Sequence, residues 1–377
     1  MPEYQRLTLS ETFYCEGGAF ADLNRDGHPD VISGPYWYAG PDFQTRHELY
    51  SPQPFDPLRY SDNFVAEAYD VNGDGWLDVM VIGFPGTEAV WYENPAGTDR
   101  PWRRHLALDG VDNESAMFGD VNGDGRPDLI CSHQGRWGYA EWNPQAPTGP
   151  WTFRSVSKPG PWQRFTHGLG FGDVNGDGRM DLIERGGWWE QPADPEQAEW
   201  RLHPADFGKG GAQMYALDLN GDGLPDIVTS RDAHGYGLSW FEQVRATDGA
   251  TQFREHVILP ADETLGPNGV QFSQLHAVTL ADLDGDGHLD LVTGKRWWAH
   301  GPKGDPEPNA DPVVYAFLYR RDDDGSVRFE PRLIDRASGV GTALAVADAN
   351  GDGRLDILAA NKRGTFLFLS QHAASRP

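Results

Sequence analysis

The chain has 377 residues, with 57 aspartates and glutamates against 31 lysines and arginines and a formal net charge of −26. This excess of negative charge argues against nucleic acid as a partner, because phosphates would be repelled. The length exceeds what one compact hydrophobic core usually supports, which favours several domains or a repeat architecture. No apolar run is long enough to predict a transmembrane helix.

One nonapeptide pattern, D-x-[ND]-x-D-G-x-x-D, recurs along the chain. Its seven copies begin, at intervals of 45 to 66 residues, at Asp22, Asp70, Asp120, Asp173, Asp218, Asp282 and Asp348. Each copy is followed directly by an apolar run typical of a buried strand, as in residues 79–82. A repeat of this period is typical of propeller blades or a similar array of β-units.

The nonapeptide carries side-chain oxygens at positions 1, 3, 5 and 9 and glycine at position 6. Such a loop suits a hard cation, because the oxygens converge while glycine permits a sharp turn. The pattern starts like an EF-hand loop, but aspartate at position 9 replaces the usual glutamate at position 12, and the flanks read as strands. We therefore predict structural calcium, or a similar hard cation, in up to seven loops. The predicted ligands are Asp22, Asn24, Asp26, Asp30, Asp70, Asn72, Asp74, Asp78, Asp120, Asn122, Asp124, Asp128, Asp173, Asn175, Asp177, Asp181, Asp218, Asn220, Asp222, Asp226, Asp282, Asp284, Asp286, Asp290, Asp348, Asn350, Asp352 and Asp356.

Each repeat unit shows four short strand patterns, which in the second unit cover residues 65–69, 79–82, 89–95 and 102–106. In chain order, the third pattern recurs at residues 35–38, 139–142, 188–192 and 238–242, and the fourth at residues 46–49, 153–156, 200–203 and 253–257. Seven such units without a convincing helix predict an all-β fold. We expect a seven-bladed β-propeller that spans residues 1–377 as one domain, with a calcium-type loop between the first and second strands of each blade.

The two ends of the chain complement each other. The seventh unit shows strand patterns at residues 343–347, 357–360 and 365–369 and then stops without a fourth. Residues 3–10 match the missing pattern. We predict that they form the outer strand of the last blade, so that no sheet edge stays open.

The repeat count and the loop chemistry resemble the FG-GAP/VCBS family of calcium-loop propellers, which includes the integrin α-subunit head. Longer phrases, at residues 34–38, 167–173, 187–192 and 295–301, resemble the propeller part of the aldos-2-ulose dehydratases (1,5-anhydro-D-fructose dehydratases). The first resemblance implies the fold, but it does not name a function, because the FG-GAP/VCBS family includes both adhesion modules and enzymes. The second implies a dehydratase that acts on sugars.

Histidines gather on one predicted face of the propeller. The loops before the first strand and between the second and third strands lie opposite the calcium loops, and four histidines in these loops belong to the adjacent units four to six. Together with other polar residues they predict a binding site at the axial mouth. We assign metal or base roles to His167, His234 and His276, and helper roles in catalysis to Glu114, Lys295 and His300.

Two functions follow from these patterns. The first is a carbohydrate-active lyase of the hydro-lyase type, in which a divalent transition metal such as zinc and a histidine base promote β-elimination from a keto- or anhydro-sugar. The alternative is a noncatalytic, calcium-stabilised propeller that binds glycan or protein. In either case the expected partner is a small carbohydrate or another ligand, and the oligomeric state is left open.

The cysteines and the N-terminus bear on the compartment. Cys15 and Cys131 are too few for a disulfide framework and are expected to be buried thiols. Residues 1–6 lead directly into a strand pattern without signal-peptide features, which predicts a cytoplasmic protein. Calcium loops instead favour a secreted or periplasmic protein whose leader has been removed, and both compartments stay open.

Overall fold

The computed structural model describes residues 3–194, 199–247 and 249–371, whose regular structure consists of 28 β-strands. Within these ranges there is no helix long and apolar enough to cross a membrane.

Five of the hydrogen-bonded sheets have four strands each. The first comprises β2 (Gly18–Ala21), β3 (Asp30–Ser33), β4 (Tyr36–Tyr38) and β5 (Arg46–Glu48). The second comprises β6 (Val65–Tyr69), β7 (Asp78–Ile82), β8 (Thr87–Glu93) and β9 (Arg103–Val111). The third comprises β10 (Met117–Gly119), β11 (Asp128–His133), β12 (Arg136–Glu141) and β13 (Thr152–Ser155). Another comprises β22 (Val278–Ala281), β23 (Asp290–Gly294), β24 (Val314–Arg321) and β25 (Val327–Asp335). The last comprises β26 (Leu344–Ala347), β27 (Asp356–Asn361), β28 (Gly364–Gln371) and β1 (Glu3–Ser10).

The remaining sheet has eight strands, in the order β17-β16-β15-β14-β18-β19-β20-β21. Its strands from the fourth repeat unit are β14 (Leu169–Gly172), β15 (Asp181–Glu184), β16 (Gly187–Glu190) and β17 (Arg201–Pro204). Those from the fifth are β18 (Gln213–Leu217), β19 (Asp226–Ser230), β20 (Leu238–Arg245) and β21 (Thr251–Leu259).

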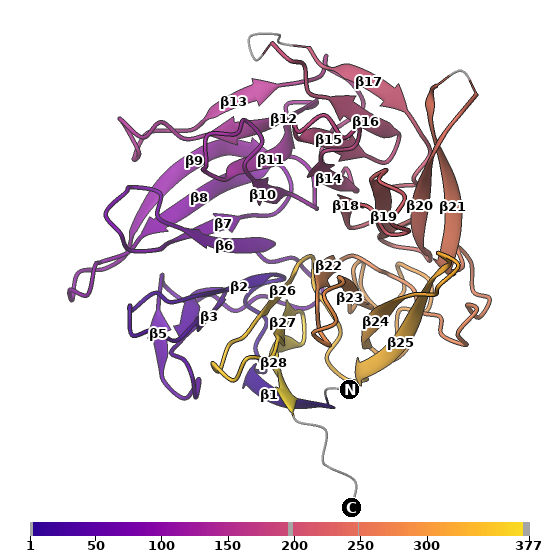
Figure 1. Cartoon of the computed structure of the whole chain (residues 1–377). Helices are drawn as coiled ribbons and strands as arrows, with labels where there is room; N and C mark the ends of the chain where they lie inside the picture. Colours follow the sequence, from indigo (N-terminus) through magenta and orange to yellow (C-terminus); the bar gives the residue numbers. More distant parts are fainter. Residues whose placement is uncertain (1–2, 195–198, 248, 372–377) are drawn as a thin grey trace, which may run out of the picture.

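The sheets are arranged in a ring, as in a β-propeller (Figure 1). The first strand of each repeat unit lies toward the centre and the last strand toward the periphery. The second strands, such as β7 and β19, are buried along their whole length, whereas every residue of the peripheral β5 is exposed. Because neighbouring sheets cover a second strand on both faces, apolar residues follow one another along it rather than alternating with polar ones, as residues 79–82 do in β7.

The prediction of seven separate blades is wrong. The structure has five separate four-stranded blades, and the fourth and fifth repeat units share one continuous sheet. The two units join because β14 pairs in parallel with β18. Glycine permits this approach: a Cβ atom at Gly170 would lie 2.1 Å from the backbone oxygen of Met214, and one at Gly172 would lie 2.8 Å from the Cβ of Ala216.

The expectation of a calcium-type loop in every blade also needs correction. The nine-residue loops do lie between the first and second strands, but their carboxylates are engaged in hydrogen bonds to the backbone. Asp78, at position 9, is buried and accepts hydrogen bonds from the amides of Val71 and Asn94. Asp70, at position 1, accepts hydrogen bonds from the amides of Gly73, Asp74 and Gly75. The loops are thus closed by their own hydrogen bonds, and seven equivalent calcium sites are not shown.

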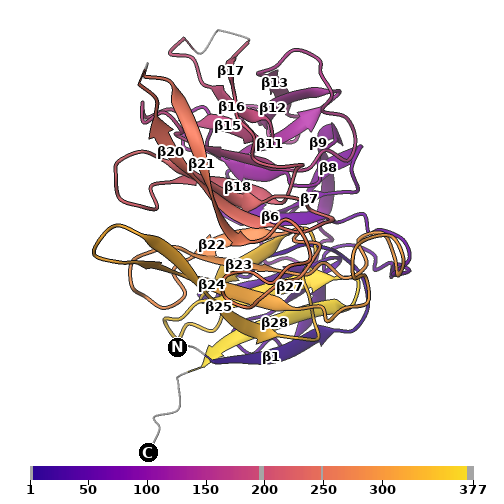
Figure 2. The ribbon, with the colours of Figure 1, turned by 90° about the vertical axis from the view of Figure 1, so that its right-hand side faces the viewer.

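The two ends of the described chain meet in one sheet. β1 pairs antiparallel with β28, from Glu3 opposite Gln371 to Ser10 opposite Thr365. Figure 2 shows β1 and β28 side by side at the edge of the ring. Since β1 covers the outer edge of β28, the first and last segments of the repeat array are held together by backbone hydrogen bonds.

Candidate metal centre

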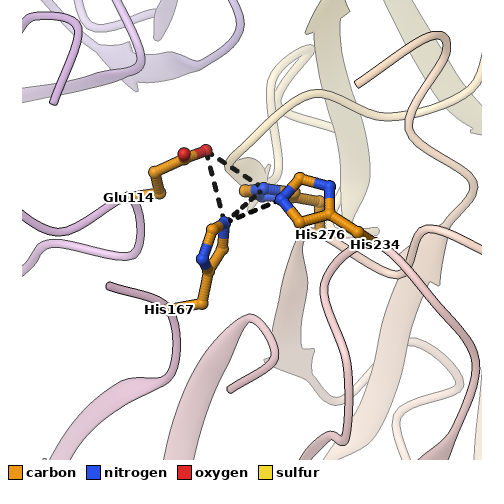
Figure 3. A group of neighbouring side chains, drawn as sticks. All are labelled: Glu114, His167, His234 and His276. Carbon is orange, nitrogen blue, oxygen red and sulfur yellow. Dashed lines mark hydrogen bonds and ion pairs between the residues drawn. The ribbon is translucent and has the colours of Figure 1, made fainter. Parts of the chain in front are cut away.

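Four side chains from four different loops converge at the middle of the ring. Glu114 precedes β10, His167 precedes β14, His234 lies between β19 and β20, and His276 precedes β22. One ligand atom from each lies within 4.8 Å of the other three. Figure 3 shows the three imidazole rings and the carboxylate pointing toward one another.

The spacing of these atoms fits a single bound cation. The Nε2 atom of His167 lies 3.2 Å from Nε2 of His276 and 3.1 Å from Nε2 of His234. The Oε2 atom of Glu114 lies 3.1 Å from Nε2 of His276 and 3.5 Å from Nε2 of His167. Neutral imidazoles that face one another through lone pairs repel unless a proton or a metal ion lies between them. Three histidines and one carboxylate form a ligand set typical of zinc and related divalent metals.

The protonation states favour metal binding. Burial, reinforced by the neighbouring Arg296 guanidinium, lowers the pKa of His276 to about 3. Burial and the adjacent histidines also lower the pKa of His234. Burial alone would raise the pKa of Glu114, but hydrogen bonds from His167 and His276 hold it well below its usual value. At neutral pH His234 and His276 are therefore neutral and Glu114 is ionised, the forms in which these side chains bind a metal.

A buried ion-pair network supports Glu114. Arg296 donates to Oε2 of Glu114 at 3.3 Å and to Oε1 of Glu16 at 2.6 Å. All three side chains are buried, and the guanidinium lies over the ring of Phe64. One guanidinium thus lies between two buried carboxylates from the first and third repeat units, and it fixes the Glu114 carboxylate beside the histidines.

The backbone before three of the histidines is strained. Phe165, Gln274 and Trp298 have positive φ angles of 69°, 62° and 54°, and each stands two residues before a histidine of this face. Side chains larger than glycine adopt this conformation at a cost of about 1 kcal/mol or more, usually where the surrounding structure requires it. Here the turns direct His167, His276 and His300 toward the same region.

A second acidic group lies behind the metal centre. The side chain of Asp305 is 4% exposed, and its Oδ1 lies 2.8 Å from Nδ1 of His300 and 3.8 Å from Nδ1 of His234. The ring centroids of His234 and His300 are 4.3 Å apart. Burial would raise the pKa of Asp305, but the hydrogen bonds from His300 lower it. The ionised Asp305 carboxylate therefore lies near Nδ1 of His234, the ring nitrogen that faces away from the metal centre, and it is hydrogen-bonded to Nδ1 of His300.

The structure therefore brings His167, His234, His276 and Glu114 together, and it places His300 beside them. Lys295 lies apart: its side chain is buried and donates to Oγ of Ser273 at 2.6 Å. The sequence reasoning missed Glu16, Arg296 and Asp305, none of which has a local motif. Arg296 and Asp305 do lie in the β23–β24 loop beside Lys295 and His300, so a search of that loop for further polar residues would have found them.

The fold and this ligand set define a β-propeller protein with a candidate histidine–carboxylate metal centre. The family comparisons agree with the fold: the FG-GAP-like repeat model matches residues 70–131, 120–183 and 218–293, and the FG-GAP repeat model matches residues 340–373. The chain belongs to the FG-GAP repeat family, as its nonapeptides predict. No curated protein matches it, so the resemblance to the aldos-2-ulose dehydratases stays a prediction.

The comparison with solved structures finds chains that this chain resembles at low sequence identity. The exotype rhamnogalacturonan lyase YesX is 13% identical, with a TM-score of 0.51 and coverage of 98% of this chain and 73% of that chain. The structure of BBS1N in complex with ARL6DN is 11% identical, with a TM-score of 0.52 and coverage of 99% and 97%. An Agrocybe aegerita lectin that recognises non-reducing terminal N-acetylglucosamine is 16% identical, with a TM-score of 0.49 and coverage of 99% and 86%. Identities this low show a shared fold alone.

Proposed function

We propose that the chain is a metal-dependent carbohydrate lyase that removes water from a keto- or anhydro-sugar by β-elimination. The observation that carries the proposal is the convergence of three histidine Nε2 atoms and the Glu114 carboxylate. His234 and His300 keep this centre accessible, since their side chains are 24% and 49% exposed. YesX, which has a similar fold, is a rhamnogalacturonan lyase, and this supports the choice of a carbohydrate as substrate.

The residues around the centre suit proton transfer. A bound divalent metal would supply a Lewis acid for the carbonyl oxygen of the sugar. His300 bonds to Asp305 through Nδ1, so its Nε2 keeps a lone pair and accepts the proton from the carbon next to the carbonyl. The electrons of that C–H bond form the new double bond as the β-hydroxyl group leaves.

Lys362 is the proposed proton donor to the departing hydroxyl. Its Nζ donates to the backbone oxygen of Trp298, in the loop that carries His300, and lies 4.3 Å from the ring centroid of Tyr60. Burial lowers the pKa of Lys362 to about 8, which suits a proton donor near neutral pH. The hydroxyl then leaves as water, and solvent carries the proton from His300 back to Lys362.

Metal analysis and a substrate screen test this function together. We expect the purified chain to hold one equivalent of zinc or a similar transition metal, and to convert at least one member of a panel of keto- and anhydro-sugars into a product with enone absorbance. If the chain holds no transition metal after purification without chelators, and zinc added to it does not bind, the lyase proposal fails. The noncatalytic glycan-binding alternative is then favoured.

Asp305→Asn tests the support that Asp305 gives to the metal centre. Carboxylates that face the outer nitrogen of a ligating histidine raise its basicity, and their loss typically weakens metal binding by about 10–100-fold. We expect a loss in this range for zinc, measured by competition with a chromophoric chelator. Asp311→Asn is the matched control, because Asp311 lies in the same β23–β24 loop with a 67% exposed side chain. Equal affinity in the two variants would contradict the role of Asp305.

Structural calcium stays a prediction for the nonapeptide loops. In the sixth loop, ligand atoms of Asp282, Asp284 and Asp290 lie within 4.8 Å of one another, as a shared hard cation would require, and a bound cation would take the place of Arg320 in its 2.6 Å ion pair with Asp284. We expect a calcium-selective chelator to lower the melting temperature, since a cation that binds only the folded chain stabilises it. The His234→Ala variant should show the same decrease, because its loops are intact. A melting curve that the chelator leaves unchanged would exclude a stabilising cation.

A further inference from the structure

A cavity lies between the first and second repeat units, outside the metal centre. Its volume is about 440 Å³, and aromatic side chains form much of its wall. They are Tyr14, Tyr50, Phe55, Phe84 and Tyr92. The rings of Tyr50 and Tyr92 are stacked, with their centroids 4.7 Å apart. A concave site of this size with aromatic walls and a few polar groups is typical of a small-ligand pocket.

The cavity opens beside the loops that build the metal centre. Phe84, in the β7–β8 loop, has its ring centroid 5.1 Å from that of Tyr60 and 5.5 Å from that of Phe165. Phe165 stands two residues before His167. The neighbouring Arg164 donates to the backbone oxygen of Pro85 at 2.6 Å, so the loop that carries His167 packs directly against a loop that lines the cavity.

The charges in the cavity are predominantly negative. Asp62, Glu88 and Asp109 line it, and the one arginine there, Arg104, forms an ion pair with Glu88. Within the described ranges the carboxylate of Asp62 forms no salt bridge, and its hydrogen bond comes from its own backbone amide, so it keeps acceptor capacity for a ligand. This balance disfavours a sugar acid, whose carboxylate would meet unpaired negative charge.

We propose that this cavity is a subsite for a neutral glycosyl unit, so that the substrate of the metal centre is the end of a neutral oligosaccharide. The aromatic rings pack against the apolar face of the sugar, and Asp62 accepts hydrogen bonds from its hydroxyl groups. The link to catalysis rests on the proposed lyase function, whereas sugar binding in the cavity can be measured without turnover.

Binding calorimetry on the full chain tests the subsite. The probes are neutral gluco-, galacto- and manno-oligosaccharides of two to five units, the corresponding monosaccharides, and galacturonate oligomers. We expect at least one neutral oligosaccharide to bind about tenfold more tightly than its monosaccharide, as one well-made set of polar contacts provides. Asp62→Asn and Phe55→Ala should each remove this advantage. Asp112→Asn is the matched control, because Asp112 occupies the equivalent position in the next repeat unit and lies outside the cavity. This variant should still bind the oligosaccharide more tightly than the monosaccharide.

Three results would overturn the proposal: no saccharide in the panel binds, oligosaccharides and monosaccharides bind equally, or galacturonate oligomers bind best. Equal effects of Asp62→Asn and Asp112→Asn would also contradict it. Failure of the lyase proposal has a different signature, because it appears in the metal content and in the enone assay and leaves oligosaccharide binding unchanged.

Discussion

Replacing His234 with alanine is expected to abolish turnover and to weaken zinc binding by at least about 100-fold, while the fold is kept. His234 is the most accessible of the four candidate metal ligands, and its Nε2 lies 3.1 Å from Nε2 of His167. Its loop has its own support, since the Asp232 carboxylate accepts hydrogen bonds from the amides of His234 and Gly235. The loss should therefore be confined to the metal centre.

The zinc content, the melting temperature and the rate of enone formation measure this effect. His47→Ala is the control, because His47 lies in the outer strand β5, away from the metal centre, where its ring stacks on that of Trp37 in β4. It should keep zinc and activity. Turnover by His234→Ala at the rate of the unmodified protein would show that the reaction takes place elsewhere.

Replacing Arg296 with alanine is expected to destabilise the protein by about 3–5 kcal/mol. The substitution leaves the carboxylates of Glu16 and Glu114 buried without the guanidinium that lies between them. Removing one partner of a buried ion pair costs far more than removing one at the surface, because the remaining charge stays out of water. Chemical denaturation followed by tryptophan fluorescence measures the change.

Two variants make the Arg296 experiment decisive. Arg6→Ala removes an exposed arginine from its 3.2 Å ion pair with Asp335 and should cost at most about 1 kcal/mol. The double variant Arg296→Met with Glu16→Gln should recover much of the lost stability, because Glu16 no longer carries a buried charge. A similar loss for Arg6→Ala and Arg296→Ala would show that the buried network contributes little.

Local sequence patterns predicted much of the fold. The nonapeptides located the loops between first and second strands, because most of the hydrogen bonds that close these turns join residues of the nonapeptide itself, as between Val71 and Asp78. The apolar runs after them located the buried second strands. Family membership followed from the same repeated residues.

The number of separate sheets could not be predicted in this way. The parallel pairing of β14 with β18 depends on the close approach of Gly170 to Met214, which are 44 positions apart in the chain. Each repeat unit, taken alone, reads as a closed set of four antiparallel strands. Nothing within one unit shows that its first strand also bonds to the first strand of the next unit.

By itself, the sequence determined that this chain is an all-β repeat protein with acidic turns, and that several histidines fall in equivalent loops on one face. Only the tertiary structure decided that three of those histidines meet Glu114, and that Arg296, Glu16 and Asp305 surround them. The physical reason is the range of the interactions. Turns and buried strands depend on neighbours in the chain, whereas the centre depends on closure of a ring that brings residues 114, 167, 234 and 276 to one point.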